Sequence, residues 1–208
     1  MVDVKQIEAT FRKHFAHSGV ITHIDPETGL IDVDGHVYLK RKVSRLPVSF
    51  AHVTGSFVCA DSRLKTLAGA PHSVRESFDC SHNALTSLVG APEYVGRDFK
   101  CAYNKLTNLK GAPDEVGGDF NCVSNPLVSL EGAPSHVKTW FLVPYSPDLP
   151  LLRTLVAKSG VWLDWGLKPH LEVEDILRDP EFKGKGKQGA IKCALALIKA
   201  GYKGNAKW

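Results

Sequence analysis

The stretch "FKCAYNKLTNLKGAPDEVGGD" occupies residues 99–119, and the twenty-one residues before it, 78–98, read "FDCSHNALTSLVGAPEYVGRD". Both segments carry Phe, Cys, Asn, two Leu, Gly-Ala-Pro and Val at equal offsets. The pattern F-x-C-x-x-N-x-L-x-x-L-x-G-A-P-x-x-V fills four consecutive units, at residues 57–77, 78–98, 99–119 and 120–140. A fixed period of this kind is typical of chains that stack similar units, so the pattern predicts a solenoid.

Each unit divides into a strand, a turn and a return. Phe and Cys stand two residues apart and therefore point to the same side of an extended segment, which predicts a short strand. The Asn of three units (Asn83, Asn104, Asn125) is replaced by Ser62 in the first unit. An Asn after a strand can bind loop backbone groups, so stacking predicts a buried polar ladder. The Gly-Ala-Pro return is expected to run extended or as one short turn, with its Val closing the core.

The expected fold is an α+β repeat: a right-handed, curved, leucine-rich-repeat-like solenoid with one parallel sheet on its concave side. Three regions are predicted. Residues 1–42 form a cap, with a helix near Asp3–His17 and a small antiparallel sheet. Residues 43–147 form the solenoid and begin with a degenerate half-unit at Val43–Ser56. Residues 148–208 form a basic helical segment, and we favour a cap over an independent domain for it.

Within this last region we expect short helices at Asp148–Lys158 and Leu171–Arg178, with Trp162 and Trp165 between them. A longer amphipathic helix is predicted at Gln188–Ala200. Its expected apolar face comprises Ile191, Leu195 and Ile198.

Composition sets broad limits on function. The chain has 208 residues, 43% of them hydrophobic and 23% charged, which is an ordinary globular balance. No apolar run is long enough to span a membrane and the first residues are unlike a signal peptide, so we expect a cytoplasmic protein, in a host cytoplasm if it is phage-encoded. Five cysteines without a C-x-x-C pair fit a reducing compartment.

The repeat resembles leucine-rich repeats of the short bacterial type, although Phe and Cys stand where that family commonly has Leu, and Gly-Ala-Pro replaces its usual return. It is also similar to repeat proteins of unassigned role encoded by tailed bacteriophages. The resemblance covers about Val43–Val143. It implies a protein-binding surface, with a host or anti-phage defence protein as the partner that is inhibited or redirected.

Several residues suggest chemistry that spacing argues against. Cysteines 59, 80, 101 and 122 would form a line with about 5 Å between sulfurs, whereas zinc needs converging ligands. Cys80 with His82 suggests a nucleophile and base, but the strand turns Cys80 inward. Asp98 and Asp119 have the separation of a retaining glycosidase pair, which any repeat column produces. We therefore predict no catalytic residue, no metal site and no cofactor.

The C-terminal segment offers an alternative function. The formal charge of the chain is +4, and residues 149–208 hold 11 basic and 6 acidic residues. A Gly-Lys-rich loop there carries a possible basic patch of Lys183, Lys185 and Lys187, which with Lys192, Lys199, Lys203 and Lys207 would contact nucleic-acid phosphates. The same lysines also fit a solvated cap, and Trp208 is expected to pack.

The concave face is the predicted binding site because its outward columns vary from unit to unit. The predicted site comprises Asp79, Ser81, His82, Asp98, Lys100, Tyr103, Asp119, Asn121 and Trp140, with His82, Tyr103 and Trp140 as anchors. The first prediction is therefore a non-enzymatic protein-binding module. The alternative is a nucleic-acid-binding protein, and a homo-oligomer is possible if one sheet end is left uncapped.

Overall fold

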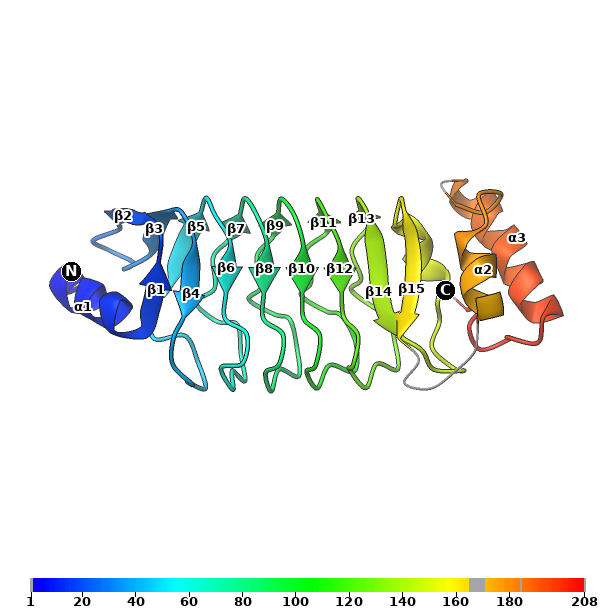
Figure 1. Cartoon of the computed structure of the whole chain (residues 1–208), viewed down its shortest axis with the longest axis horizontal. Helices are drawn as coiled ribbons and strands as arrows, with labels where there is room; N and C mark the ends of the chain where they lie inside the picture. Colours follow the sequence, from blue (N-terminus) through cyan, green and yellow to red (C-terminus); the bar gives the residue numbers. More distant parts are fainter. Residues whose placement is uncertain (1, 165–170, 184, 208) are drawn as a thin grey trace.

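The chain is a parallel-sheet β-solenoid of about six turns with three helices, in a computed structural model that describes residues 2–164, 171–183 and 185–207. Its coils stack along one nearly straight axis, with α1 (Val4–His14) at one end and α2 (Leu171–Arg178) and α3 (Gly186–Lys199) at the other (Figure 1). Trp165 and Trp208, considered above, lie outside the described residues.

Sheet A forms one side of the stack and runs parallel from β4 onward. Its eight strands, in spatial order, are β1 (Phe15–His17), β4 (Val37–Leu39), β6 (Phe57–Val58), β8 (Phe78–Asp79), β10 (Phe99–Lys100), β12 (Phe120–Asn121), β14 (Trp140–Pro144) and β15 (Gly160–Asp164). Phe99 lies opposite Phe78 on one side and Phe120 on the other. The predicted strand positions and the 21-residue register are thereby confirmed.

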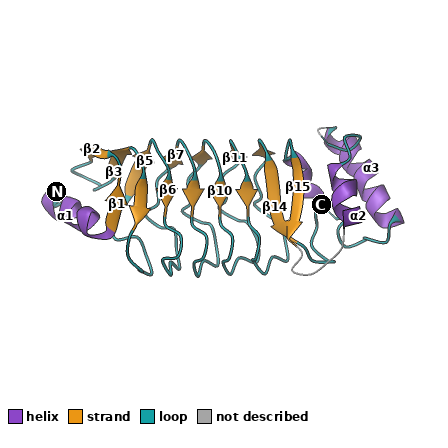
Figure 2. Cartoon of the chain, viewed as in Figure 1, coloured by secondary structure: helices purple, strands orange, loops and turns teal. Residues whose placement is uncertain are grey.

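Sheet B makes the prediction of a single sheet wrong, because the returns also pair with one another (Figure 2). Its seven strands, in spatial order, are β13 (His136–Val137), β11 (Glu115–Val116), β9 (Tyr94–Val95), β7 (Ser73–Val74), β5 (Phe50–Val53), β3 (Ile31–Asp34) and β2 (Val20–Ile24). Strands on both sides impose the same spacing of about 4.8 Å per coil. The predicted curvature is therefore absent.

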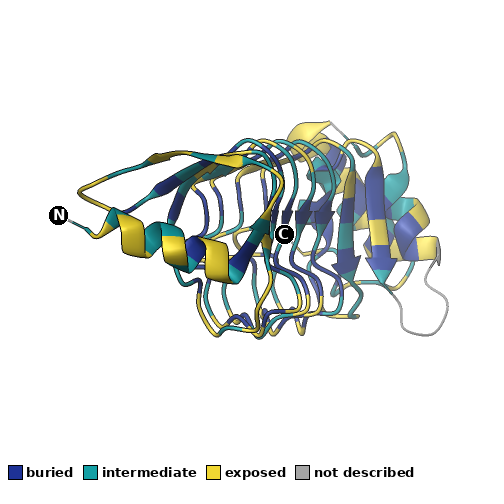
Figure 3. Cartoon of the chain, turned by 60° about the vertical axis from the view of Figure 1, so that its left-hand side comes forward, coloured by how far each residue is buried: buried dark blue, intermediate teal, exposed yellow. Residues whose placement is uncertain are grey.

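The core between the sheets is built from stacked columns of identical residues. Phenylalanine rings of adjacent coils stack with centroid separations of 5.7 Å for Phe57 and Phe78, and 5.4 Å for both Phe78 with Phe99 and Phe99 with Phe120. These rings are fully buried, whereas exposed residues lie along the turns (Figure 3). Each ring buries a large apolar area and adds about 0.5–1.5 kcal/mol through ring–ring contact.

The predicted asparagine ladder is present. Asn104 Nδ2 donates to the carbonyl oxygens of Cys80, Cys101 and Ala102 at 3.1, 3.1 and 3.2 Å, and its Oδ1 accepts from Leu85 N at 3.0 Å. Asn83 and Asn125 repeat the pattern one coil before and one coil after. One side chain thus fastens the turn of its own coil to the preceding coil.

The N-terminal elements extend both sheets. Helix α1 begins at its N-cap Asp3, whose Oδ1 accepts from Gln6 N at 3.1 Å, and buries Phe11 against Phe15 and Phe50. The expected antiparallel pairing of β2 with β3 occurs. Phe15–His17, which the prediction placed in the helix, instead forms β1 and pairs antiparallel with β4. However, β4 and β3 also pair in parallel with β6 and β5, so these strands are the first rungs of the two long sheets.

The C-terminal elements differ most from the predictions. The expected helix at Asp148–Lys158 is the short 3-10 helix η1 (Leu152–Val156), and strand β15 was not predicted. Helix α3 packs through Gly189, Cys193 and Leu197, which are buried. The predicted apolar face is solvent-exposed, at 45% for Ile191, 61% for Leu195 and 44% for Ile198, because α3 packs on its smaller apolar side.

Candidate functional site

The outer face of sheet A carries most of the predicted site residues. One residue per coil points outward from each short strand, and the register aligns these residues into a column. The column comprises Val58, Asp79, Lys100, Asn121, Leu142 and Trp162. Three of the predicted site residues, Asp79, Lys100 and Asn121, are therefore brought together in one column on this face.

Asp98 and Asp119 hold the backbone of neighbouring coils. Asp98 Oδ1 accepts from Asp119 N at 3.0 Å, and Asp119 Oδ1 accepts from Trp140 N at 3.0 Å and from the Thr139 hydroxyl. Ser77 Oγ plays the same part for Asp98 N at 3.3 Å. This second ladder, at the start of each strand, gives both carboxylates a structural task and argues against a glycosidase pair.

Asp79 and Asn121 are likewise engaged with local backbone. Asp79 Oδ1 accepts from Ser81 N at 2.9 Å, and Asn121 Oδ1 accepts from Val123 N at 3.2 Å, so each closes a turn two residues long. Lys100 lies between them with Nζ 3.6 Å from Asp98 Oδ2. The middle of the face is polar and largely satisfied by the protein itself.

Ser81 is buried, whereas the prediction placed it on the exposed face. It is 7% exposed, because the chain turns at the next position and draws this side chain under the strand end. That next position, occupied by His82 and Tyr103 in successive coils, is left-handed, with φ of 55° and 53°. The two exposed rings stack at 4.2 Å with an interplanar angle of 11°, forming a small aromatic platform at the turn.

The C-terminal end of the outer face carries a concentrated cluster, which we call the tryptophan pocket. It is lined by Asp119, Trp140, Leu142, Trp162 and Arg178 and has a volume of about 270 Å³. Trp140 is 38% exposed and Trp162 is 50% exposed, and they belong to the paired strands β14 and β15. Two partly solvent-exposed indoles therefore stand on neighbouring strands.

Two local features shape the tryptophan pocket. Gly160 lies opposite Trp140 in the ladder, and a Cβ there would stand 2.9 Å from the indole, so only glycine leaves the ring its place. The Arg178 guanidinium lies 5.2 Å above the Trp140 ring centroid, a cation–π contact. Of the residues that line this pocket, the predicted site included Asp119 and Trp140 but not Leu142, Trp162 or Arg178.

Helix α2 holds Arg178 in place and covers the free edge of β15, the last strand of sheet A. Arg178 Nε donates to Val161 O at 2.9 Å and its second nitrogen reaches Glu174 Oε1 at 3.1 Å. Glu174 is 4% exposed, and the same oxygen accepts from Leu163 N at 2.9 Å. An edge strand with unpaired amides invites association with another chain, so this side-chain pair covers the free edge of β15.

The cysteines have the environment of inert core residues. Burial raises the pKa of the thiols of Cys59, Cys80, Cys101 and Cys122 well above the ordinary value, and raises the pKa of Cys193 to about 12. A nucleophilic cysteine needs the opposite shift. In the part of the chain that the structure describes, no group of three or more His, Cys, Asp or Glu side chains is placed to hold a metal ion.

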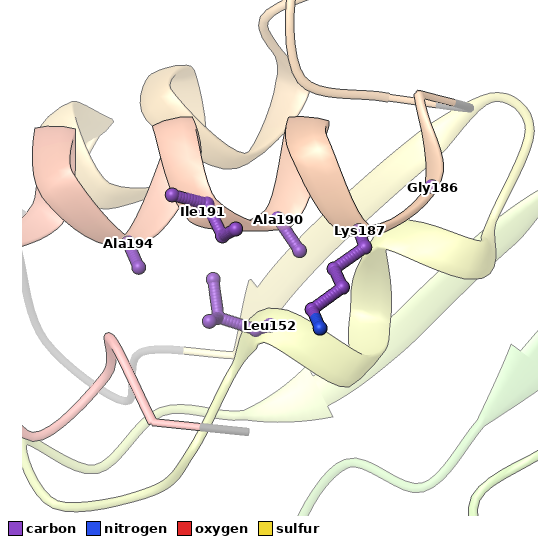
Figure 4. Close-up of a pocket in the computed structure, with 6 residues that line it drawn as sticks. All are labelled: Leu152, Gly186, Lys187, Ala190, Ile191 and Ala194. Atoms are coloured by element: carbon purple, nitrogen blue, oxygen red, sulfur yellow. The ribbon is translucent and has the colours of Figure 1, made fainter.

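The three lysines of the predicted basic patch differ in their surroundings. Lys183 is partly buried, and desolvation, with Arg178 nearby, lowers the pKa of its ammonium. Lys185 and Lys187 are exposed. Lys187 lies at the rim of an apolar pocket of about 610 Å³, in which Leu152 of η1 faces Ala190, Ile191 and Ala194 of α3 (Figure 4). This arrangement is apolar with a charged border.

Two wall residues of the tryptophan pocket, Trp162 and Arg178, had weak signals in the sequence. Trp162 continues the outward column, but its partner Leu142 precedes it by 20 residues, so a strict 21-residue period misses it. Arg178 comes from a helix, and its place on the pocket depends on how that helix packs. Trp162 falls into the outward column once the last repeat is allowed to be one residue shorter than 21.

The comparisons with known proteins add no relative: no protein-family model, curated protein or solved structure matches the chain. Among the described residues, no helix has the length and apolar character needed to cross a membrane.

Proposed function

We propose that the chain is a non-enzymatic protein-binding module whose partner docks on the outer face of sheet A, anchored at the tryptophan pocket. The observation that carries the proposal is the meeting of two half-exposed indoles, Leu142 and Arg178 in one concavity. Trp and Arg dominate the binding energy of protein interfaces, particularly where they surround a shallow pocket that a partner side chain can fill.

The rigidity of the pocket supports the same proposal. Trp140 and Trp162 stand on adjacent paired strands, and Arg178 is held by Val161 O and Glu174. Little side-chain freedom is therefore lost when a partner binds, which favours affinity. The aromatic platform of His82 and Tyr103, together with Lys100 of β10, would then form the polar rim of the same interface.

The identity of the partner is approached through the sequence pattern. The leucine-rich-repeat likeness and the similarity to phage-encoded repeat proteins suggest a host protein, with inhibition or redirection of a host or anti-phage defence function as the outcome. Such a protein would act in the host cytoplasm. The buried thiols and the carboxylates engaged in backbone ladders favour binding over catalysis.

The test is capture from a bacterial lysate with the intact chain and two variants. Trp140→Ala with Trp162→Ala removes both indoles, and Tyr94→Ala removes an equally exposed aromatic ring (51%) from sheet B. A protein retained by wild type and by Tyr94→Ala, and lost with the double variant, supports the proposal once the purified pair binds in calorimetry. Equal retention by all three chains contradicts it.

A further inference from the structure

A positively charged surface lies at the N-terminal end of the solenoid, far from the tryptophan pocket. It follows the edge at which the strands of sheet A end. Three segments contribute to it: the end of α1 (12–13), the turn after β4 (40–45) and the turn after β6 (61–65). We call it the N-terminal basic edge. Its basic residues are Arg12, Lys13, Lys40, Arg41, Lys42, Arg45, Arg63 and Lys65, all exposed.

Backbone hydrogen bonds hold the three segments side by side. Lys40 N donates to His14 O at 2.8 Å, and Lys40 Nζ donates to Arg12 O at 3.2 Å, which joins the helix end to the first turn. Val43 N donates to Ser62 O at 2.8 Å and Lys65 N to Ser44 O at 2.9 Å, which joins the first turn to the second. The eight positive charges therefore occupy one continuous ridge.

These charges are not neutralised within the described residues, since none of the eight takes part in an ion pair there. Asp61 is the single carboxylate in the three segments. Four of the six acidic residues of the N-terminal region lie on the β2–β3 hairpin of sheet B (Asp25, Glu27, Asp32 and Asp34), and the other two, Asp3 and Glu8, lie at the N-cap and in the first half of α1. This separation explains why the region is nearly neutral in a simple count while it carries a strong local positive field.

From this arrangement we infer that the N-terminal basic edge binds the phosphate backbone of duplex nucleic acid without reading its sequence. Four arginines supply planar donors that fit phosphate oxygens in pairs. None of the large apolar side chains exposed among the described residues comes from these segments. The three segments thus contain neither an exposed aromatic anchor for a protein partner nor the aromatic rings on which single-stranded bases stack.

The inference gives a definite salt dependence. If about five of the eight side chains contact phosphates, the slope of log K against log salt concentration is about −4.5. The experiment measures fluorescence anisotropy of a labelled 20-base-pair duplex with the full chain between 50 and 200 mM NaCl.

Matched charge reversals locate the site. The edge variant carries Arg41→Glu, Arg45→Glu and Lys65→Glu. The control variant carries Lys185→Glu, Lys187→Glu and Lys203→Glu, which gives the same change in net charge on exposed C-terminal lysines. The edge variant is expected to lose roughly three from the salt slope and more than about 30-fold in affinity at 100 mM NaCl, and the control less than about threefold. Circular dichroism melting verifies that both variants are folded.

Three results would overturn the inference. Equal weakening by both variants would indicate attraction through net charge alone. Tighter binding of a labelled 20-nucleotide single strand than of the duplex would exclude duplex backbone as the target. Binding of polyglutamate that depends on the edge, with no duplex binding by wild type, would assign the edge to an acidic protein.

Discussion

The four repeat coils at residues 57–140 and the elements at the two ends of the stack use their polar and aromatic side chains differently. In the coils, Asn104 and Asp98 bond backbone groups of neighbouring coils, and Phe99 is fully buried. At the ends, Trp162 is half-exposed and Arg45 has no ion pair among the described residues. The coils therefore satisfy most of their own polar groups as a rigid spacer, and the side chains that carry the two proposed binding surfaces are concentrated where the repeat rule stops.

This division follows from the physics of stacking. A column of identical residues is stable only if each member satisfies its neighbours, so the inward positions tolerate little change. The terminal coils have a neighbour on one side only, and the protein closes them with different elements, α1 at one end and α2 with η1 at the other. Side chains near the ends are therefore free to depart from the residues repeated in the coils, and they do.

The largest expected effect is a loss of stability at alkaline pH, which tests whether the cysteine thiols are buried along the whole stack. The native thiols stay protonated at alkaline pH because burial raises their pKa, whereas thiols of the unfolded chain ionise above about 8.5. The native state then holds more protons, so stability falls as pH rises through that value. At pH 9.5 each thiol removes about 1.4 kcal/mol, and five remove roughly 7 kcal/mol.

Urea unfolding at pH 7.0 and 9.5, followed by circular dichroism, measures this loss. Cys101→Ala lowers stability at both pH values but should reduce the alkaline loss by one thiol, about 1.4 kcal/mol. An alkaline loss identical in wild type and variant would show that the ladder thiols do not control it.

The second prediction concerns the asparagine ladder. Asn104→Ala should lower the free energy of unfolding by about 3 kcal/mol, because it leaves the buried Leu85 N without its acceptor and removes one donor from each of three buried carbonyls. Asn108→Ala is the control: its side chain accepts one local bond from Lys110 N, and its loss should be about 1 kcal/mol. Equal losses would mean that the ladder is not what locks the coils.

The third prediction compares the two apolar sides of α3. Leu197→Ala should lower the free energy of unfolding by about 3 kcal/mol, since Leu197 is fully buried. Leu195→Ala, at 61% exposure, should change it by less than about 0.5 kcal/mol. The reverse ranking would restore the face predicted from sequence and contradict the packing of the C-terminal cap.

How much the sequence can predict differs along the chain for physical reasons. The 21-residue period identified sheet A, the asparagine ladder and the buried Val column, because each depends on residues repeated at fixed offsets. Sheet B was missed because its central strands are two residues long and bury one side chain each. Their pairing comes from the stacking itself, which no single unit displays.

The site residues follow the same pattern. Asp79, Lys100, Asn121 and Trp140 are in register with the repeat and lie where the columns predict. Trp162 follows a 20-residue spacing, and the positive field of residues 40–45 is masked in composition by acidic residues of the neighbouring hairpin. Packing of a terminal helix, as for Arg178 and the exposed face of α3, depends on contacts that periodicity does not specify.

The smallest expected effect concerns the cover on the last strand. Glu174→Gln keeps an oxygen that accepts from Leu163 N but weakens the pairing with Arg178, so the free energy of unfolding should fall by about 1–2 kcal/mol. Hydrogen exchange of the amides of β15 should accelerate while that of β10 stays unchanged, because the loss is local to the end of the stack.

Asp175→Asn makes the same charge change on an exposed neighbour in α2 and should leave the exchange of β15 unaltered. Faster exchange in both variants would indicate that the net charge of α2, rather than the Glu174 contact, protects the strand. Faster exchange throughout the repeat coils would show that the cap and the coils unfold as one unit, and the contrast between a self-satisfied spacer and specialised ends would then fail. Protection lost from β15 alone would instead mark the tryptophan pocket as a separately adjustable part of the molecule, since Trp162 and Arg178 both depend on that strand.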